Sequence, residues 1–256
     1  SSADEAKYLN SPESPIFHKS EILYNLARAR ASIRKNRHVV IMEGFGDVLA
    51  ANRAGVMNVV GTMGTSLTQQ HITKLKRLVN QITICYDGDN AGFEAAKRAA
   101  ILLNDAKFQV EIAILPDKLD PDDYIKQYGP ESFVDKILGK PHAYIAFMMM
   151  YAKRGKNFQF ENDTLQYLQE VLEQLVGKTS PIERDLYIRQ LASETNISQE
   201  AIYAQFRRIE ADTIKQHKKQ PVMPKELVAA PIEVRKLTAT DRAERLLLSH
   251  MLHDLS

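Results

Sequence analysis

Residues 38–117 alternate between short apolar runs and longer segments with helical periodicity. The apolar runs predict strands, and the segments between them, in which apolar residues recur every three to four positions, predict helices. Strands and helices that alternate at this spacing are typical of a mostly parallel sheet with helices on both faces. We therefore predict an α/β domain. The expected strands are 38–43, 57–61, 81–89 and 108–117, and the expected helices between them are 46–55, 68–80 and 91–105.

The rest of the chain predicts helices and one linker. Residues 20–36 begin with Ser20 as the expected N-cap and have apolar residues at helical spacing, which predicts one amphipathic helix. A proline-bearing stretch near the end lacks periodicity and is typical of a linker, and a last helix then opens a further domain, so we expect a fragment of a longer protein. Further helices are expected at 131–152, 161–176, 181–194 and 198–212. The domain bounds that follow are 1–37, 38–130, 131–212, 213–240 and 241–256.

Composition excludes several classes of protein. The longest uninterrupted apolar run, Ala143–Ala152, is too short to cross a bilayer, which takes roughly 18–20 apolar residues. The chain has one cysteine and therefore no intramolecular disulfide, and its histidines lack the paired spacing of a zinc site. A formal net charge of +2 is too small to indicate nucleic-acid binding by itself. We expect a cytoplasmic protein with no membrane partner.

Acidic residues follow three of the expected strands. Side chains that follow different strands of a parallel sheet converge at its carboxyl edge, where ligands usually bind. Carboxylates held that close repel one another, so either their pKa values rise or cations bind between them. Oxygen ligands without His or Cys suit Mg²⁺ or Mn²⁺, which can activate a hydroxyl group and neutralise a triphosphate. The carboxylates expected at this edge are Glu43, Asp47, Asp87, Asp89, Asp120 and Asp122.

Two segments allow two interpretations each. GTMGTS, residues 61–66, places small residues and backbone amides before a helix N-terminus, where phosphate could bind, but it lacks the Lys of a P-loop and fits a plain turn equally well. Residues 191–206 fit a DNA-reading helix-turn-helix or, more commonly, a helical hairpin. The candidate nucleotide-binding residues of the first segment are Gly61, Thr62, Gly64 and Thr65.

Several segments resemble a known family. EGFGD, YDGDNAG and LDPDD resemble the three acidic motifs of the Toprim fold, which bacterial primases, type IA and II topoisomerases and some nucleases share. KYLNSPESPIFHKSEILYN, residues 7–25, closely resembles the stretch just before Toprim in bacterial DnaG-type primases. With the GTMGTS loop and the terminal AERLLLSHML, the resemblance covers nearly the whole chain.

The resemblance implies a primase active site with the Toprim fold. Glu43, Asp87 and Asp89 are the implied catalytic residues, with Glu43 as a metal ligand or general base. The implied ligands of Mg²⁺ or Mn²⁺ are Glu43, Asp47, Asp87, Asp89, Asp120 and Asp122. The implied contacts to nucleotide phosphates or template, beside the GTMGTS residues, are Lys7, Asn10, Ser11 and Lys19.

The implied activity is DNA-directed RNA primer synthesis, in which ribonucleoside triphosphates are joined on a single-stranded DNA template at the bacterial replication fork. Zn²⁺ is expected only in an N-terminal domain that is missing here, and residues 1–37 are the end of the subdomain that follows it. The replicative helicase is expected to bind a C-terminal domain whose first helix is 241–256. Because acids and lysines form one cluster of opposite charges, we also expect guanosine tetra- and pentaphosphate, (p)ppGpp, to inhibit by competing for the same site.

Two alternatives stay open. A Toprim nuclease or topoisomerase fragment is disfavoured, because the chain shows no strand-gate domains or active-site tyrosine and a nuclease would not need residues 7–25. An inactive Toprim scaffold that binds DNA through its helical tail is disfavoured by the intact carboxylates in all three motifs.

Overall fold

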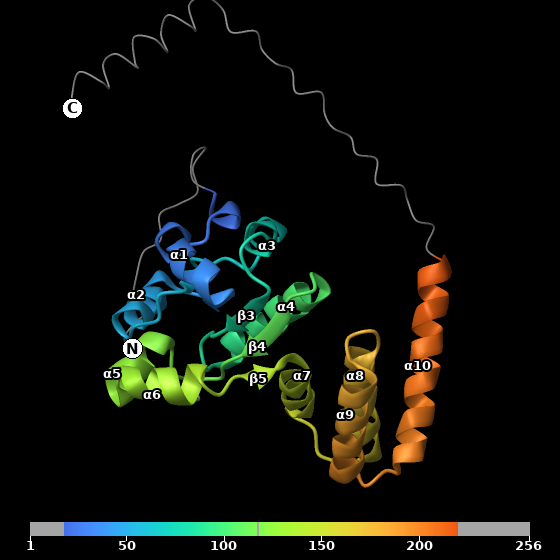
Figure 1. Ribbon diagram of the computed structural model, residues 1–256. Coiled ribbons are helices and arrows are strands. Elements are labelled where there is room, and N and C mark those ends of the chain that lie inside the picture. The colour runs from blue at the N-terminus through green and yellow to red at the C-terminus, as the bar shows by residue number, and fades with distance from the viewer. Residues whose placement is uncertain (1–17, 117, 220–256) are drawn as a thin grey trace, which may run out of the picture. The chain divides into compact units, whose positions relative to one another are not determined.

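The computed structural model describes residues 18–116 and 118–219 of the chain. Its centre is a five-stranded sheet with the strand order β2-β1-β3-β4-β5. Figure 1 labels β3, β4 and β5 of this sheet. The first four strands in sequence are parallel, and β5 pairs antiparallel with β4. The prediction of a mostly parallel α/β sheet is therefore confirmed. The strands are β1 (His38–Met42), β2 (Val59–Gly61), β3 (Gln81–Ile84), β4 (Gln109–Ile112) and β5 (His142–Ala143).

Helices connect the strands and continue after the sheet. Nowhere in the described chain is there a helix that could cross a membrane. The helices before β4 are η1 (Lys19–Glu21), α1 (Leu26–Asn36), α2 (Phe45–Arg53), α3 (Gln69–Lys76) and α4 (Asn90–Asp105). Those after β4 are α5 (Pro121–Tyr128), α6 (Pro130–Ser132), η2 (Phe133–Leu138), α7 (Tyr144–Lys153), α8 (Glu161–Leu175), α9 (Pro181–Thr195) and α10 (Gln199–Lys219).

Successive residues of β1 pack on opposite faces of the sheet. Val39 and Ile41 are buried in one apolar cluster with side chains of α1, α3 and α4. Val40 and Met42 are buried in a second cluster with side chains of α2, α5 and η2. Because helices cover both faces, the strand is a continuous apolar run instead of an alternating one.

The single helix expected at 20–36 is wrong in its first third. The 3-10 turn η1 is followed by an extended stretch in which Tyr24 forms an antiparallel bridge with Gly61 at the end of β2. The Tyr24 N–H donates to the Gly61 carbonyl at 2.8 Å, so this stretch pairs with a strand edge that would otherwise be open. Asn25 then turns through φ of 65°, and α1 begins at Leu26, so Ser20 is not its N-cap.

The helix expected at 131–152 is also interrupted. Its first part forms α6 and the π-helical η2, and its last part forms α7. Between them, Pro141 disfavours a helical conformation at the residue before it and cannot donate a helical hydrogen bond. The two residues of β5 follow and extend the sheet past residue 130, where we expected the α/β domain to end.

The later helices follow the sequence pattern closely. The Ser180 hydroxyl accepts a hydrogen bond from the Glu183 N–H at 3.3 Å and caps α9. Asn196, with φ of 55°, ends α9 before α10 begins. The helix α10 continues to Lys219, which is seven residues into the linker expected at 213–240. The predicted helix at 241–256 lies outside the described residues.

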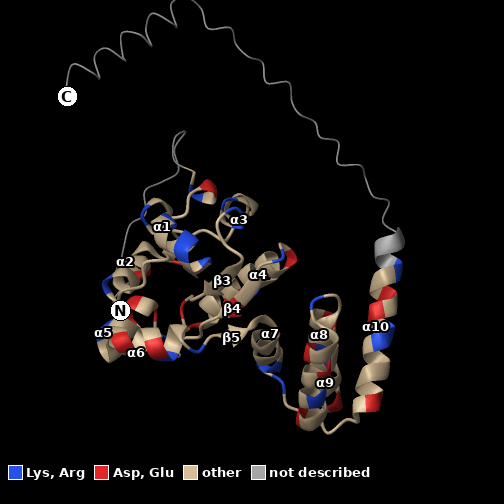
Figure 2. Cartoon of the chain, in the orientation of Figure 1, with Lys and Arg blue, Asp and Glu red and all other residues tan. Residues whose placement is uncertain are grey.

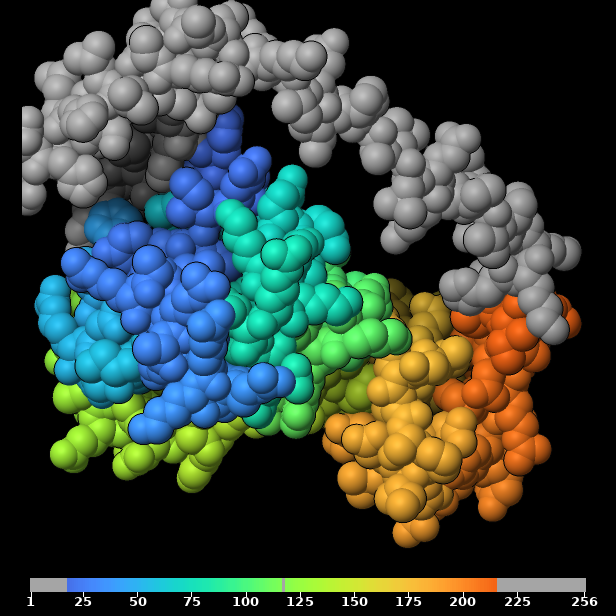
Figure 3. Space-filling model, turned by 45° about the horizontal axis from the view of Figure 1, so that its top comes forward, coloured from blue at the N-terminus to red at the C-terminus, as the bar shows by residue number. Residues whose placement is uncertain are grey.

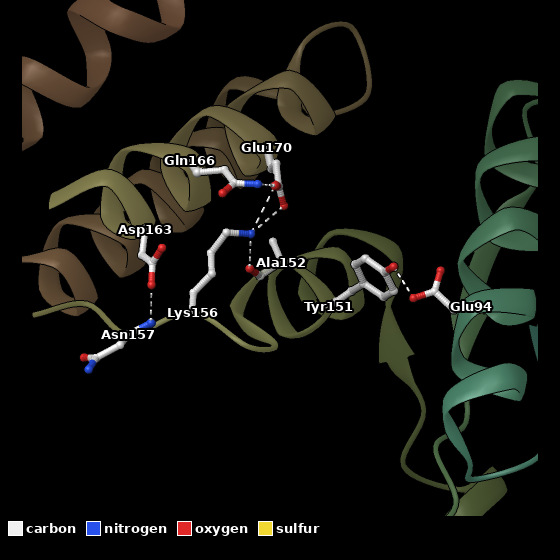
Figure 4. A network of polar contacts seen from close by, with 8 residues as sticks. All are labelled: Glu94, Tyr151, Ala152, Lys156, Asn157, Asp163, Gln166 and Glu170. Carbon is white, nitrogen blue, oxygen red and sulfur yellow. Dashed lines mark hydrogen bonds and ion pairs between the residues drawn. The ribbon is translucent and has the colours of Figure 1, made fainter. Parts of the chain in front are cut away.

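Polar contacts join α4 to α7 and α7 to α8 (Figure 4). The Tyr151 hydroxyl donates to the carboxylate of Glu94 on α4. Just after α7, the Lys156 ammonium binds both carboxylate oxygens of Glu170 on α8, each at 3.0 Å. It also donates to the carbonyl of Ala152 at 2.8 Å, so one lysine closes the turn between the two helices.

The loop after β3 lies directly against the loop after β4. The Gly88 N–H donates to the Leu119 carbonyl at 2.8 Å, and the Gly88 carbonyl accepts from the Lys118 N–H at 3.2 Å. A Cβ atom at Gly88 would lie 2.1 Å from the carbonyl oxygen of Pro116. Only glycine allows this approach, and it fixes the distance between two of the acidic motifs.

Gly88→Ala is therefore expected to destabilise the chain by about 1–3 kcal/mol, because the added methyl group displaces one loop from the other. The free energy of unfolding in urea measures the loss. A variant as stable as the wild type would show that the two loops are not packed together.

Candidate functional site

Six carboxylates, called the acid group below, stand at or just beyond the carboxyl ends of three strands (acidic residues are red in Figure 2). Glu43 follows β1, and Asp87 and Asp89 follow β3. Because β1 and β3 are paired neighbours, with Ile41 opposite Ile84, the acids that follow them reach the same edge of the sheet. The acid group is Glu43, Asp47, Asp87, Asp89, Asp120 and Asp122.

Members of the acid group act on one another electrostatically. Burial raises the pKa of Glu43 to about 7, and the negative charges of Asp87, Asp89 and Asp47 add to the rise. Burial also raises the pKa of Asp47 to about 7, with further contributions from Asp87 and Asp120. The fold thus brings five carboxylates from three separate motifs into one region, as the strand pattern predicted.

Three of these acids also hold the backbone around them. Oδ2 of Asp47 accepts a backbone hydrogen bond at 3.2 Å within the first turn of α2. Asp89 caps α4 by accepting from the Gly92 N–H at 2.7 Å, and Asp120 caps α5 by accepting from the Asp123 N–H at 2.6 Å. A carboxylate has two oxygens, so a cap and a metal ligand are compatible in one side chain.

Asp122 differs from the other five acids. Its carboxylate forms an ion pair with Lys126, one turn later in α5, at 2.5 Å. Its backbone N–H is hydrogen-bonded to Asp47. Asp122 is also not among the charges that raise the pKa of Glu43 or Asp47. The structure thus gives Asp122 a part in orienting Asp47, and its role as a metal ligand stays a prediction.

The donor chemistry of the acid group fits a divalent cation. All of its side-chain donors are oxygens, and Oε1 of Glu43 is buried with no hydrogen-bond partner in the described chain. Among the described residues, however, no three acidic, histidine or cysteine side chains stand in an arrangement that could hold an ion. The protein atoms alone therefore do not form a finished metal centre, and Mg²⁺ or Mn²⁺ here stays a prediction.

The GTMGTS loop forms a tight turn between β2 and α3. Its N–H groups donate to main-chain carbonyls, from Thr62 to Met42 at 3.1 Å and from Gly64 to Glu43 at 3.3 Å. The Thr65 N–H similarly donates to the Thr62 carbonyl at 3.4 Å. These three amides are engaged within the chain and do not point to a phosphate, and phosphate binding by the loop stays a prediction.

The loop instead borders a cavity of about 310 Å³ that Glu43 also lines. Gly61 is not part of this lining, because it is buried at the end of β2, where its N–H and carbonyl pair with Tyr24. Its role in nucleotide binding stays a prediction, and the structure supports only its pairing role. The loop residues at the cavity are Thr62, Gly64, Thr65 and Ser66, and Leu67 follows them in the lining.

Arg98 of α4 also lines this cavity, and the sequence analysis did not single it out. It lies on a helical face with three small residues, Ala91, Ala95 and Ala99, that recur every fourth position. The sequence pattern that could have pointed to Arg98 is an arginine beside this row of alanines, on the helix that follows an acidic motif. The pattern is weak, because the same row is also typical of a helix that packs closely on a sheet.

Of the basic and polar contacts implied before β1, only Lys19 lies in the described chain. Lys7, Asn10 and Ser11 lie outside the described residues. Lys19 opens η1, and its carbonyl accepts from Nε2 of the buried His71 at 3.0 Å, which holds η1 against α3 (Figure 3). The direction of its ammonium group towards the acid group stays a prediction.

Three family models match the chain. A Toprim-like model matches residues 40–125, which hold the sheet edge and all six acids. A model of the N-terminal domain of the DNA primase catalytic core matches residues 1–30. A model of the DnaB-helicase binding domain of primase matches residues 145–200, upstream of the segment 241–256 where we expected helicase contact to begin.

Relatives and solved structures agree with these matches. The DNA primase of Halalkalibacterium halodurans is 41% identical over 99% of this chain, which spans 43% of that relative. A DNA primase domain from Pseudomonas aeruginosa is 32% identical with a TM-score of 0.61, covering 79% of this chain and 64% of its own. A DnaG primase catalytic domain bound to single-stranded DNA is 28% identical, with a TM-score of 0.61 and coverage of 78% and 64%. This chain belongs to the bacterial DnaG-type DNA primases.

Proposed function

We propose that this chain carries the nucleotidyl-transfer site of a primase, which joins ribonucleoside triphosphates into an RNA primer on single-stranded DNA. The observation that carries the proposal is the position of five carboxylates from three motifs at one sheet edge, where burial and the neighbouring negative charges raise the pKa values of Glu43 and Asp47. A cluster of like charges that is partly buried is unfavourable for folding by itself, so its presence supports a cation-dependent task.

Glu43, Asp47, Asp87, Asp89 and Asp120 are the residues that would hold Mg²⁺ or Mn²⁺. When bound, such an ion neutralises the triphosphate and lowers the pKa of the attacking hydroxyl. The caps at Asp89 and Asp120 hold these carboxyl groups in fixed directions before any ligand arrives. Glu43 is either a ligand or the base that accepts the hydroxyl proton at Oε1, the atom that is buried without a partner in the described chain.

The partners follow from the same family. The similar catalytic domain bound to single-stranded DNA supports a DNA template for this chain. The match of 145–200 to a helicase-binding model supports a replicative helicase as partner, whether it contacts those residues or the segment 241–256. Ribonucleoside triphosphates as substrates, and (p)ppGpp as an inhibitor at the same site, rest on the charge of the acid group. The domain bounds 1–37, 38–130, 131–212, 213–240 and 241–256 also remain proposals.

Glu43→Gln is expected to make the metal-free chain more stable, with a Tm about 2–4 °C higher, because a half-buried negative charge is removed from its like-charged neighbours. The same variant is expected to bind Mn²⁺ at least about tenfold more weakly, since it loses a charged ligand. Thermal unfolding without metal and the electron paramagnetic resonance signal of free Mn²⁺ measure the two effects.

Glu131→Gln is the matched control, because Glu131 is an exposed residue of α6 outside the acid group. It should change neither quantity. Unaltered Mn²⁺ affinity in Glu43→Gln would show that the acid group is not a cation site, and the proposed function would then be wrong.

Asp89 allows the capping role to be separated from the metal role. Asp89→Asn retains an oxygen that can accept from the Gly92 N–H, so we expect stability close to that of the wild type or higher. Asp89→Ala removes the cap and should lose about 1 kcal/mol. Both should weaken Mn²⁺ binding to a similar extent. If only Asp89→Ala weakens it, Asp89 acts by capping α4 and does not ligate the ion.

A further inference from the structure

The cavity beside Glu43 has charges of opposite sign on its walls. Its volume of about 310 Å³ lies at the lower end of the range for small-molecule sites, which is roughly 300–1,000 Å³. Glu43 and Arg98 are the charged residues that line it, and the other polar side chains there are hydroxyls of Thr62, Thr65 and Tyr86 together with that of Ser66. The rest of the lining is mainly apolar, including Leu67 and Leu102, so the two charged side chains are the groups in the cavity that favour a charged ligand.

The helix α4 leaves room for this cavity and supplies its positive charge. The α4 residues that line it include Ala91, Ala95 and Ala99, whose methyl groups fill little space. Arg98 is exposed, and no ion pair or hydrogen bond joins it to another residue of the described chain. Arg154, by contrast, hydrogen-bonds to the Asn90 side chain and lies over a ring. The Arg98 guanidinium is therefore available to a ligand.

Tyr86 lines the cavity together with the two charged residues, Glu43 and Arg98, and with Thr62. The phenol is buried at the carboxyl end of β3, one residue before Asp87. Arg98 thus borders the same cavity as Glu43, a member of the acid group.

We propose that this cavity binds the outer phosphates of a nucleoside triphosphate, with Arg98 as the cation that holds them. The proposal rests on the proposed function, because phosphates can lie beside Glu43 only when a cation of the acid group offsets its charge. Arg98 then neutralises the opposite end of the phosphate chain. A guanidinium suits this position, since its planar fork can donate two hydrogen bonds to one phosphate.

Calorimetric titration of the full chain with inorganic pyrophosphate, at saturating Mg²⁺, tests the proposal. Arg98→Ala should bind pyrophosphate about tenfold more weakly, and Arg98→Lys should fall between that variant and the wild type. Lys97→Ala is the matched control, because Lys97 is the adjacent residue of α4 but stacks on the Tyr151 ring, 3.9 Å from its centroid. It should bind pyrophosphate as the wild type does.

A second titration, with a single-stranded oligodeoxynucleotide that lacks terminal phosphates, separates the two sources of phosphate. We expect its affinity to be the same in all variants. If Arg98→Ala weakens the oligonucleotide as much as pyrophosphate, or weakens neither, Arg98 does not hold the outer phosphates and the proposal is overturned.

Mn²⁺ binding distinguishes this proposal from the one on which it rests. We expect Arg98→Ala to bind Mn²⁺ normally, because Arg98 is not a ligand. If Mn²⁺ binds normally but the Arg98→Ala variant binds pyrophosphate as tightly as the wild type, this inference is overturned. The same holds if neither protein binds pyrophosphate. In both cases the proposed metal site is unaffected. A wild-type chain that binds no Mn²⁺ at the acid group refutes the proposed function itself.

Discussion

The parallel pairing of β1 with β3 is the constraint on which the site depends. Each strand is short, and its register is set by the apolar residues that must face one of two buried clusters, with Val39 opposite Ile82 and Ile41 opposite Ile84. A slip by one residue would turn every side chain of the strand to the opposite face. The same register therefore fixes both the core and the separation of Glu43 from the acids that follow β3.

The acid group works against the stability that this core provides. Burial and like charge raise the pKa values of Glu43 and Asp47, which means that their ionised forms cost free energy in the folded chain. The structure compensates locally, since Asp89 and Asp120 start helices and Asp122 pairs with Lys126. Acids that serve as caps keep the site charged while they contribute to the fold.

Much of this arrangement could be predicted from the sequence. Strands that are buried on both faces appear in the sequence as continuous apolar runs, and acids follow three of them, so the mostly parallel sheet and all six members of the acid group could be named from the sequence. The bridge of Tyr24 to Gly61, the strand β5 and the position of Arg98 could not be found, because each depends on contacts between segments far apart in the chain. Backbone hydrogen bonds to a strand edge do not require particular residue types, so the sequence does not reveal them. An arginine on a helix is equally common on a solvent-exposed face, so Arg98 did not stand out.

The pairing of Tyr24 with β2 and the pairing of β5 with β4 limit where the chain can be truncated. Tyr24 pairs with β2 and β5 pairs with β4, so at each outer strand of the parallel sheet a brief antiparallel contact occupies main-chain groups that could otherwise recruit another chain. Both contacts come from outside the stretch that carries the acidic motifs. A fragment that keeps the edges of β2 and β4 paired must therefore be longer than the segment that carries the acidic motifs. Cutting the chain at the ends of that segment would leave both strand edges unpaired, and unpaired strand edges favour aggregation.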